Sequence, residues 1–357
     1  MTRTRPRRAL ITGGAGFVAA NVADRLLREG WAVTLFDNLS RAGVERNVAW
    51  LEAQHGDRVE LVVGDVRDAA ALRNVVAGTS RVFHFAAQVA VTTSLVDPIL
   101  DFEVNARGTI NLLEALRALD DPPTLLFTST NKVYGHLDDL RLEARGRRYE
   151  PADPHVARHG ISEQRPLDFH SPYGCSKGAA EQYVLDYART FRLPATVFRM
   201  SCIYGPHQFG TEDQGWVAHF LIQALHGQPL TLFGDGLQVR DVLYVDDLVD
   251  AMLAAHEAIE RTTGRAFNVG GGCGNTVSLL ELIGLIGELI GSRPAYGLEP
   301  WRPADQRYYV SDLSKLRAAT GWAPRVPVDE GVDRLLAWLV ESGTAAPRAL
   351  VGGKVAS

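Results

Sequence analysis

The chain has 357 residues, of which 46% are hydrophobic and 22% are charged, and its formal net charge is −5 at pH 7. This length fits one large α/β domain with a smaller one attached. The negative charge gives no basic footprint for nucleic acid. No apolar run is long enough to span a bilayer, and the Arg-rich start lacks the apolar core of a signal peptide. We therefore expect a cytoplasmic protein with neither a nucleic-acid nor a membrane partner.

The cysteines also favour a cytoplasmic protein. Cys175, Cys202 and Cys273 are odd in number and too scattered along the chain for a zinc site. They fit a reducing compartment, and we expect no metal. Cys175 falls inside the most informative segment of the chain, where we interpret it as a small helix residue.

A strand, a glycine turn and a helix open the chain. Residues 8–12 (RALIT) form a short apolar strand, Gly13 to Gly16 form the turn, and residues 21–28 alternate at helical spacing. In this context the glycines let the backbone approach a pyrophosphate, which sits on the helix N-terminus. Ala19 stands where a third glycine often stands, a tolerated replacement. The segment predicts a dinucleotide site.

The next strands end in carboxylates. Residues 32–36 lead into Asp37, which is placed to accept hydrogen bonds from the adenosine ribose and to repel a 2′-phosphate, so NAD is favoured over NADP. Ser40 and Arg41 lie close enough to soften that preference. Residues 59–63 lead towards Asp65, which we expect to face the adenine. A solvated turn is the alternative interpretation of Asp37.

Strands and helices keep alternating further along. Residues 82–87 and 125–130 are strand-like, residues 68–76 and 105–116 are helical, and 193–198, 238–245 and 266–270 are again sheet-like. This order predicts an α/β fold with a doubly wound parallel sheet, Rossmann-like, and a smaller mixed α/β substrate lobe. The expected domains are 1–198 with 237–270 for NAD, 199–236 with 271–340 for the substrate, and a flexible tail at 341–357. Ligands bind beyond the carboxyl ends of such strands.

Residues 171–177 (SPYGCSK) carry Tyr173 and Lys177 at the start of a predicted helix, with Ser171 as N-cap and Pro172 in the first turn. A spacing of four puts both side chains on one face. Lowering a phenol pKa from ~10 by roughly three units takes about 4 kcal/mol, which a neighbouring ammonium helps to supply. The pair is common on ordinary helices, so its meaning depends on the dinucleotide site.

Four arginines of the second half are candidates to neutralise a diphosphate, because the guanidinium fork matches phosphate geometry. They are Arg199, Arg240, Arg302 and Arg307. Ordinary surface ion pairs are the alternative for each of them. Arg240 is the strongest candidate, since it lies in an apolar setting beside Asp241.

Together, the glycine turn, Asp37, Thr130, Tyr173 and Lys177 resemble the extended short-chain dehydrogenase/reductases that act on nucleotide sugars, over about residues 8–338. Segments 36–41, 88–94, 129–135, 167–177 and 213–217 are most similar to the epimerases of this family that invert C2 of a CDP-linked 3,6-dideoxyhexose with tightly held NAD. The resemblance implies a homodimer or higher homo-oligomer, paired through a helix bundle that includes residues 178–189, and a place in deoxysugar biosynthesis.

The resemblance also implies roles for single residues. Tyr173 would be the acid/base, Lys177 would hold the nicotinamide ribose and depress the Tyr173 pKa, and Thr130 would bond the reacting hydroxyl. The NAD contacts would be Gly13, Gly16, Phe17, Val18, Asp37, Asn38, Ser40, Arg41, Asp65, Val66, Ala86, Gln88, Tyr173 and Lys177. The nucleotide-sugar contacts would be Thr92, Ser94, Lys132, Arg199, Gln208, Arg240 and Arg302.

The chain departs from the dehydratases of this family. They carry an Asp-Glu pair directly after the threonine, whereas Asn131 and Lys132 stand here, so dehydration is not expected. Three alternatives stay open. They are a nucleotide-hexose 4-epimerase, a net NAD(H)-dependent oxidoreductase that releases its cofactor, and a non-catalytic dinucleotide sensor. The retained Tyr173 and Lys177 speak against the sensor.

Overall fold

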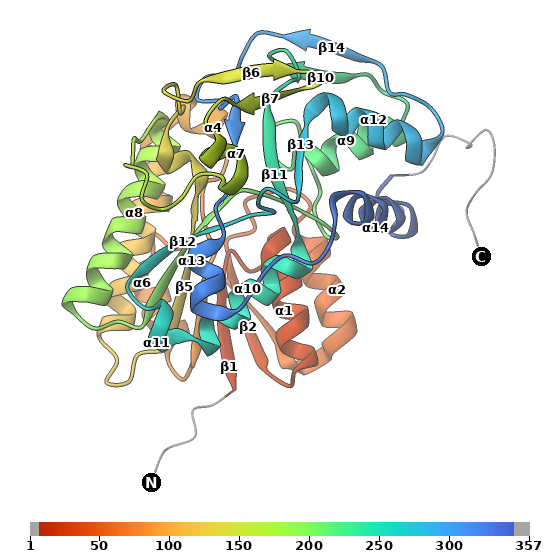
Figure 1. The fold of residues 1–357 in the computed structure, drawn as a ribbon. Helices are drawn as coiled ribbons and strands as arrows, with labels where there is room; N and C mark the ends of the chain where they lie inside the picture. Colours follow the sequence, from red (N-terminus) through yellow and green to blue (C-terminus); the bar gives the residue numbers. More distant parts are fainter. Residues whose placement is uncertain (1–6, 346–357) are drawn as a thin grey trace.

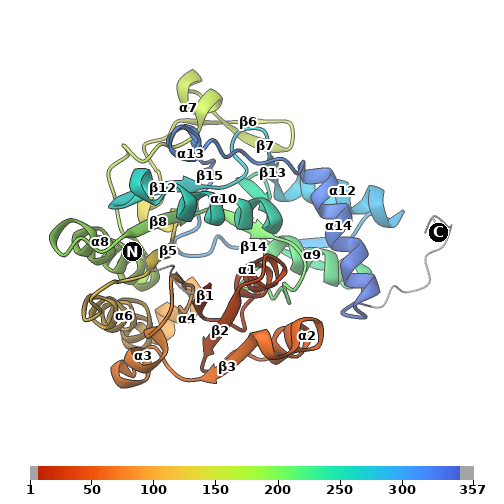
Figure 2. The ribbon, with the colours of Figure 1, turned by 90° about the horizontal axis from the view of Figure 1, so that it is seen from below.

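A computed structural model describes residues 7–345 of the chain, so most of the tail expected at 341–357 lies outside the described residues. The central element is a seven-stranded parallel sheet in the order β12-β8-β5-β4-β1-β2-β3 (Figures 1 and 2). This confirms the predicted doubly wound sheet. Its strands are β1 (Arg8–Thr12), β2 (Ala32–Asp37), β3 (Val59–Val63), β4 (Arg81–His84), β5 (Thr124–Thr130), β8 (Ala195–Met200) and β12 (Arg265–Val269).

Helices cover both faces of this sheet (Figure 2). Successive side chains of a strand point to opposite faces, so Leu10 packs into one layer and Ile11 into the other. One layer holds α1 (Phe17–Arg28), α2 (Glu45–His55), α10 (Val245–Glu257) and α13 (Ser314–Thr320); the other holds α3 (Ala69–Val76), α6 (Gly108–Arg117) and α8 (Ser171–Thr190).

Short helices lie in the connections between these strands and helices. They are η1 (Gly56–Arg58), α4 (Val91–Val96), α5 (Pro98–Phe102), the π-helical η2 (Glu103–Arg107), η3 (Asn131–Tyr134), α7 (Pro154–His159) and α11 (Ile259–Thr262). Of these, η3 directly follows β5, so Thr130 ends the strand and Lys132 lies just beyond it.

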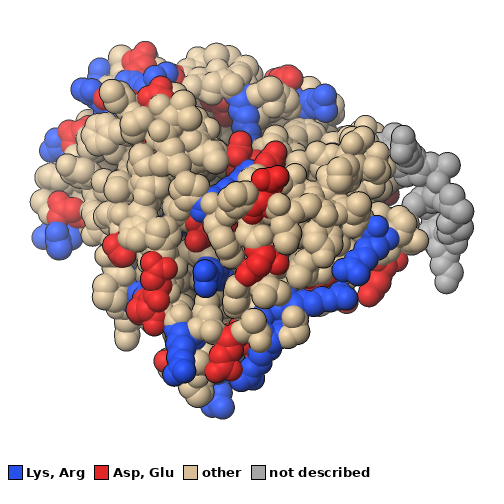
Figure 3. Space-filling model, turned by 90° about the horizontal axis from the view of Figure 1, so that it is seen from above, with Lys and Arg blue, Asp and Glu red and all other residues tan. Residues whose placement is uncertain are grey.

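A smaller lobe lies above the carboxyl edge of the sheet in Figure 1. Its own core joins α9, α12 and α14 to β11. The lobe contains β6 (Leu142–Arg145), β7 (Arg148–Pro151), β9 (Cys202–Tyr204), α9 (Trp216–Leu225), β10 (Leu230–Phe233), β11 (Val239–Tyr244), β13 (Thr276–Ser278), α12 (Leu279–Ile290), β14 (Tyr296–Glu299), β15 (Tyr308–Tyr309) and α14 (Val328–Glu341). Positive and negative side chains are interspersed on the face seen from above (Figure 3).

Four of the described elements lie outside the domain bounds expected from the sequence. β6 and β7, expected in the NAD domain, form a pair that contacts the smaller sheet through β7, and α13, expected in the substrate lobe, packs on the large sheet. The fourth is β11. Residues 238–245 were expected to belong with the NAD domain, yet β11 pairs with β9, β13 and β15 in the smaller sheet. The next helix, α10, already packs on the large sheet. Every residue of β11 is buried, so its apolar pattern is the same for either sheet and gives no sign of which one it joins.

Candidate active site

The start of α8 sets the geometry of the site. Ser171 adopts a left-handed φ of 65°, and its hydroxyl accepts a hydrogen bond from the Gly174 N–H at 3.3 Å. The Tyr173 N–H donates to Ser94 Oγ at 3.2 Å. A positive φ is strained for a residue other than glycine and is frequent at functional sites. The local turn therefore fixes the direction in which Tyr173 enters the site.

Two cavities meet at Tyr173. The first, of about 630 Å³, extends between the glycine turn, β2 and α8. The second, of about 310 Å³, extends between η3 and the smaller lobe. Their common lining comprises Val89, Tyr173, Met200, Ser201, Cys202, Gln214, Gly215 and Trp216. A phenol at this junction reaches ligands in both cavities.

All of the residues named as NAD contacts line the first cavity. The α1 helix starts at Phe17, and its N-cap Gly16 has no side chain to satisfy the first-turn N–H groups. Gly13 has a φ of 67°, and a Cβ there would lie 2.7 Å from the Ala86 N atom. This close, open helix terminus fits a pyrophosphate.

The far end of the first cavity carries the carboxylates. Asp37 is held by the N–H groups of Ala15 (3.1 Å) and Leu39 (2.8 Å). Arg67 holds the pKa of Asp65 well below its usual range, so this carboxylate stays ionised as an acceptor. Asp37 at the end of β2 suits ribose hydroxyls, and the residues present fit a dinucleotide without a 2′-phosphate.

Burial dominates the proton affinities at the junction. Burial raises the pKa of Tyr173 to about 12, the neighbouring Thr130 hydroxyl opposes this, and the Asp101 charge adds to it. Burial lowers the pKa of Lys177 to about 7, against the attraction of Asp101 and Glu181. The expected lowering of the Tyr173 pKa by Lys177 is therefore not seen in the chain alone, where burial, Thr130 and Asp101 set that pKa.

Asp101 was not anticipated from the sequence. It is fully buried, and its carboxylate accepts hydrogen bonds from Ser176 Oγ and from the amides of Gln88 and Asn105, both at 3.1 Å. It thus holds Gln88 on the cavity wall beside Lys177. Its position after a proline in a short helix resembles an ordinary surface carboxylate, so nothing in the sequence singles it out.

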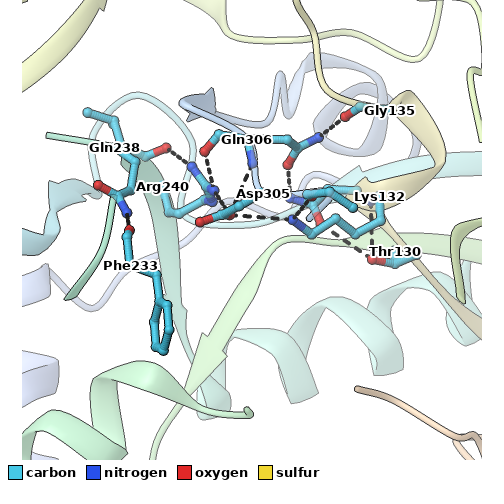
Figure 4. A network of polar contacts seen from close by, with 11 residues as sticks. Thr130, Lys132, Gly135, Phe233, Gln238, Arg240, Asp305 and Gln306 are labelled. Atoms are coloured by element: carbon cyan, nitrogen blue, oxygen red, sulfur yellow. Dashed lines mark hydrogen bonds and ion pairs between the residues drawn. The ribbon is translucent and has the colours of Figure 1, made fainter. Parts of the chain in front are cut away.

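The second cavity contains a polar network that joins η3 to the smaller lobe (Figure 4). Lys132 Nζ donates to the Ala304 carbonyl at 3.0 Å and lies 3.7 Å from Asp305 Oδ1. Arg240 Nη2 contacts the same Asp305 oxygen at 2.6 Å and also the Gln306 carbonyl. Burial lowers the pKa of Lys132, and the two cations share one carboxylate.

Arg302 is held in a similar way. Its Nη2 atom lies 2.8 Å from Glu212 Oε1, and its guanidinium lies 3.7 Å from the centroid of the Phe233 ring. Arg240 and Arg302 both line the second cavity, as do Thr92, Thr130 and Lys132. A diphosphate that binds there has to compete with the carboxylates that already hold these arginines.

Three of the expected substrate contacts lie elsewhere. Arg199 is buried between the sheet and α8, where it pairs with Glu181 of that helix. It lines neither cavity. Ser94 lies beneath Tyr173, where it supports the backbone. Gln208 lines the first cavity instead of the second. An arginine in a strand gives no sign in the sequence of whether its partner is a ligand or a carboxylate on a helix that packs against the sheet.

Residues that the sequence analysis did not single out complete the common wall, notably Met200, Ser201 and Trp216. Trp216 falls in the segment 213–217 that carried the family resemblance. Within residues 7–345, no group of His, Cys, Asp and Glu side chains is arranged to hold a metal ion. Over the same residues, none of the helices combines the length and the apolar character needed to cross a membrane.

The chain matches known proteins over most of its length. The NAD dependent epimerase/dehydratase family matches residues 9–270. The CDP-paratose 2-epimerase of Salmonella typhi is 42% identical over 336 residues, which are 92% of this chain and 98% of that protein.

Solved structures are similar as well. The UDP-glucose 4-epimerase of Thermotoga maritima with UDP-glucose has a TM-score of 0.79 and 30% identity, covering 94% of this chain and 99% of that one. The UDP-glucose 4-epimerase of Thermus thermophilus with NAD has a TM-score of 0.78 and 32% identity, covering 93% of this chain and 98% of that one.

Proposed function

The chain belongs to the NAD dependent epimerase/dehydratase family, and from this premise we propose that it inverts C2 of a CDP-linked deoxyhexose with NAD that it retains through the reaction. The similarity to the CDP-paratose 2-epimerase of Salmonella typhi supports the nucleotide, the sugar and the carbon atom. The proposed setting is deoxysugar biosynthesis in the cytoplasm, which agrees with the three free thiols of the chain.

The observation that carries the proposal is the position of Tyr173. It borders both the cavity that fits a dinucleotide and the cavity that faces the smaller lobe. One phenol can therefore serve the sugar oxygen while the neighbouring carbon lies against the cofactor side. A dinucleotide sensor has no need of this arrangement, so the geometry favours an enzyme.

In the proposed reaction, Tyr173, Thr130 and Lys177 each have a separate role. Bound NAD supplies the hydride acceptor and, in the return step, the donor. Tyr173 removes the proton from the sugar hydroxyl and later returns it to the same oxygen. Thr130 holds that oxygen, and Lys177 holds the cofactor ribose. Inversion requires the oxidised sugar to present its other face between the two steps.

The chain lacks the groups for dehydration after Thr130. Asn131 donates to Gln306 Oε1 at 3.3 Å, and Lys132 is held by the Ala304 carbonyl. Lys132 lies 3.7 Å from the Asp305 carboxylate. Burial raises the pKa of Asp305, but Arg240 and Lys132 together lower it below its usual value, so it is a poor proton donor. These contacts support epimerisation without loss of a hydroxyl.

An apolar face supports the proposed homodimer. Val96 is 86% exposed and Ile99 is 74% exposed, and Phe102 and Tyr183 are further exposed apolar side chains on the contacting helices α4, α5 and α8. Clustered exposed apolar side chains of this size mark interaction sites. We propose that a second copy of the chain covers this face, so that α8 lies in the interface.

The first test is mass spectrometry of small molecules released from the purified protein by denaturation. Stoichiometric NAD is expected. The protein is then incubated with CDP-linked and UDP-linked hexoses without added NAD, and inversion is followed by NMR at C2 and C4.

Inversion at C2 of a CDP-linked sugar supports the proposal. Inversion at C4 of a UDP-hexose identifies the alternative 4-epimerase. Turnover that requires added NAD or NADH identifies a net oxidoreductase. A protein with no dinucleotide affinity contradicts the interpretation of the glycine turn.

A further inference from the structure

A buried ion pair lies behind Tyr173 and Lys177. The side chains of Glu181 and Arg199 are 0% and 6% exposed. Arg199 Nε lies 3.0 and 3.1 Å from the two carboxylate oxygens, and Ser129 Oγ donates to Glu181 Oε2 at 2.7 Å. Arg199 Nη1 donates to the Tyr134 hydroxyl at 2.8 Å. Both charges are therefore well hydrogen-bonded, as buried charges must be.

The pair connects the elements that carry the reacting centre. Tyr173, Lys177 and Glu181 follow one another at intervals of four on α8, so they share one helix face. Ser129 directly precedes Thr130 in β5, and Arg199 belongs to the adjacent strand β8. Glu181 thus ties the helix that carries Tyr173 and Lys177 to the strand that carries Thr130.

Few charges surround the Lys177 ammonium. Asp101 from α5 and Glu181 from α8 attract it. His84 from β4 is neutral, since burial lowers its pKa to about 3. The centroid of the Phe127 ring from β5 lies 4.2 Å from Nζ.

Further charges act on the Glu181 side. The Lys315 ammonium from α13 interacts electrostatically with Glu163, Glu181 and Arg199: the two carboxylates raise its pKa, and Arg199 lowers it. Burial opposes the charge on Lys177, so its charge depends on the nearby carboxylates, and Arg199 sets how much of the Glu181 charge is left unneutralised.

We propose that Glu181 and Arg199 form a positioning pair that regulates the charge of Lys177: the Glu181 carboxylate sustains the ammonium, and Arg199 limits that effect. The proposal rests on the proposed function, because a cationic Lys177 matters only if it holds the cofactor ribose and favours the Tyr173 phenolate. It also gives Arg199 a role that differs from the expected contact with the substrate.

The sequence makes a direct test practical. Lysine occurs only at positions 132, 177, 315 and 354, so protein labelled with ¹³C at the lysine ε-carbons gives few NMR signals. Loss of one signal in Lys177→Arg assigns Lys177. Its titration midpoint is then compared in the unaltered protein, Glu181→Gln, Arg199→Met and the double variant, each checked for folding by circular dichroism.

The two single variants are expected to shift the midpoint in opposite directions. Glu181→Gln removes an attracting charge and lowers the midpoint by about one pH unit, whereas Arg199→Met leaves Glu181 unneutralised and raises it. The double variant removes both charges and is expected to titrate close to the unaltered protein. A role limited to packing has no reason to produce opposite shifts.

An unchanged Lys177 midpoint in folded Glu181→Gln overturns the proposal, and so does a shift of the same sign in both single variants. Removing one partner of a buried pair is destabilising, whereas removing both is often tolerated. If Glu181→Gln does not fold, the other two variants test the proposal. The Lys177 midpoint should rise in Arg199→Met and return to that of the unaltered protein in the double variant, and failure of either result overturns the proposal. Tyr187→Phe is the control. It removes a hydrogen bond from the other end of α8 to Glu114 on α6, and it should leave the titration midpoint of Lys177 unchanged.

The pH profile of turnover gives a second readout. If a charged Lys177 is needed, the alkaline limb in Glu181→Gln moves to lower pH by the same shift as the NMR midpoint. If the unaltered protein inverts none of the nucleotide sugars, the proposed function fails, yet the NMR titration still decides whether the pair controls Lys177. The two failures are therefore distinguishable.

Discussion

Replacing Tyr173 by Phe removes a single oxygen atom from the junction of the two cavities. The ring keeps its buried position, and the backbone N–H of residue 173 keeps its bond to Ser94. The hydroxyl interacts with Thr130, whose own oxygen keeps its bond from the Lys132 N–H when the phenol oxygen is removed. We therefore expect Tyr173→Phe to fold normally and to bind NAD as the unaltered protein does.

The size of the loss follows from the chemistry. A positioned proton-transfer group contributes about 10²- to 10⁴-fold, which corresponds to roughly 3 to 5 kcal/mol of barrier. Tyr173 would serve both half-reactions, but they occur in series, so the slower one sets the rate and the losses do not multiply. Turnover is expected to fall by about 10²- to 10⁴-fold.

The assay is inversion of a CDP-linked deoxyhexose followed by NMR, with NAD content measured on the same sample. Tyr187→Phe is the matched control, since it removes a phenolic oxygen from the same helix, bonded to Glu114 and remote from both cavities. Turnover of Tyr173→Phe within tenfold of the control would exclude the acid/base role. Loss of NAD together with turnover would instead assign Tyr173 to cofactor binding.

Three further outcomes are expected. Gly13→Ala should lose NAD and about 1–2 kcal/mol of stability, because φ is 67° and the new Cβ would lie 2.7 Å from Ala86 N; retained NAD contradicts this. The folded pKa of His84 is about 3, below its unfolded value of 6.5, so its contribution is complete above pH 6.5 and declines as pH falls. Between pH 7 and pH 5, His84→Gln should therefore lose roughly 2 kcal/mol less unfolding free energy in urea than the unaltered protein. Burial also lowers the pKa of His256 to about 3, so both proteins keep a further loss; an equal loss in the two proteins contradicts the role of His84. Ile99→Asp should convert a dimer to monomers in light scattering, whereas Val63→Asp, at another exposed apolar position on β3, should not; an unchanged mass excludes this face as the interface.

The cofactor side of the site was predictable from the sequence because its determinants are local. The glycine turn, the start of α1 and the end of β2 lie within about 30 residues of one another, and each carries its own pattern. Parallel topology then brings Asp37 and Gly13 to one edge of the sheet. The same holds for Tyr173 and Lys177, which share one helix face.

The substrate side was less predictable because its residues depend on long-range partners. Arg199 and Arg240 both follow apolar strand residues, and the sequence treats them alike. In the fold, Arg199 meets Glu181 from α8, the helix packed on the sheet, whereas Arg240 meets Asp305 from a distant loop. Only the tertiary arrangement separates a structural ion pair from a cation at the cavity.

The charges around the junction agree with the proposed combination of a retained cofactor and an acid–base role for Tyr173. Burial and Asp101 hold the Tyr173 pKa at about 12, so the chain alone keeps the phenol protonated at neutral pH. Lys177, with a pKa lowered to about 7, is only partly cationic there and gives limited help. A nicotinamide cation bound beside Tyr173 would favour the phenolate. In the proposed mechanism Tyr173 therefore becomes an effective base only when the cofactor is in place, which suits the proposed retention of NAD through both half-reactions.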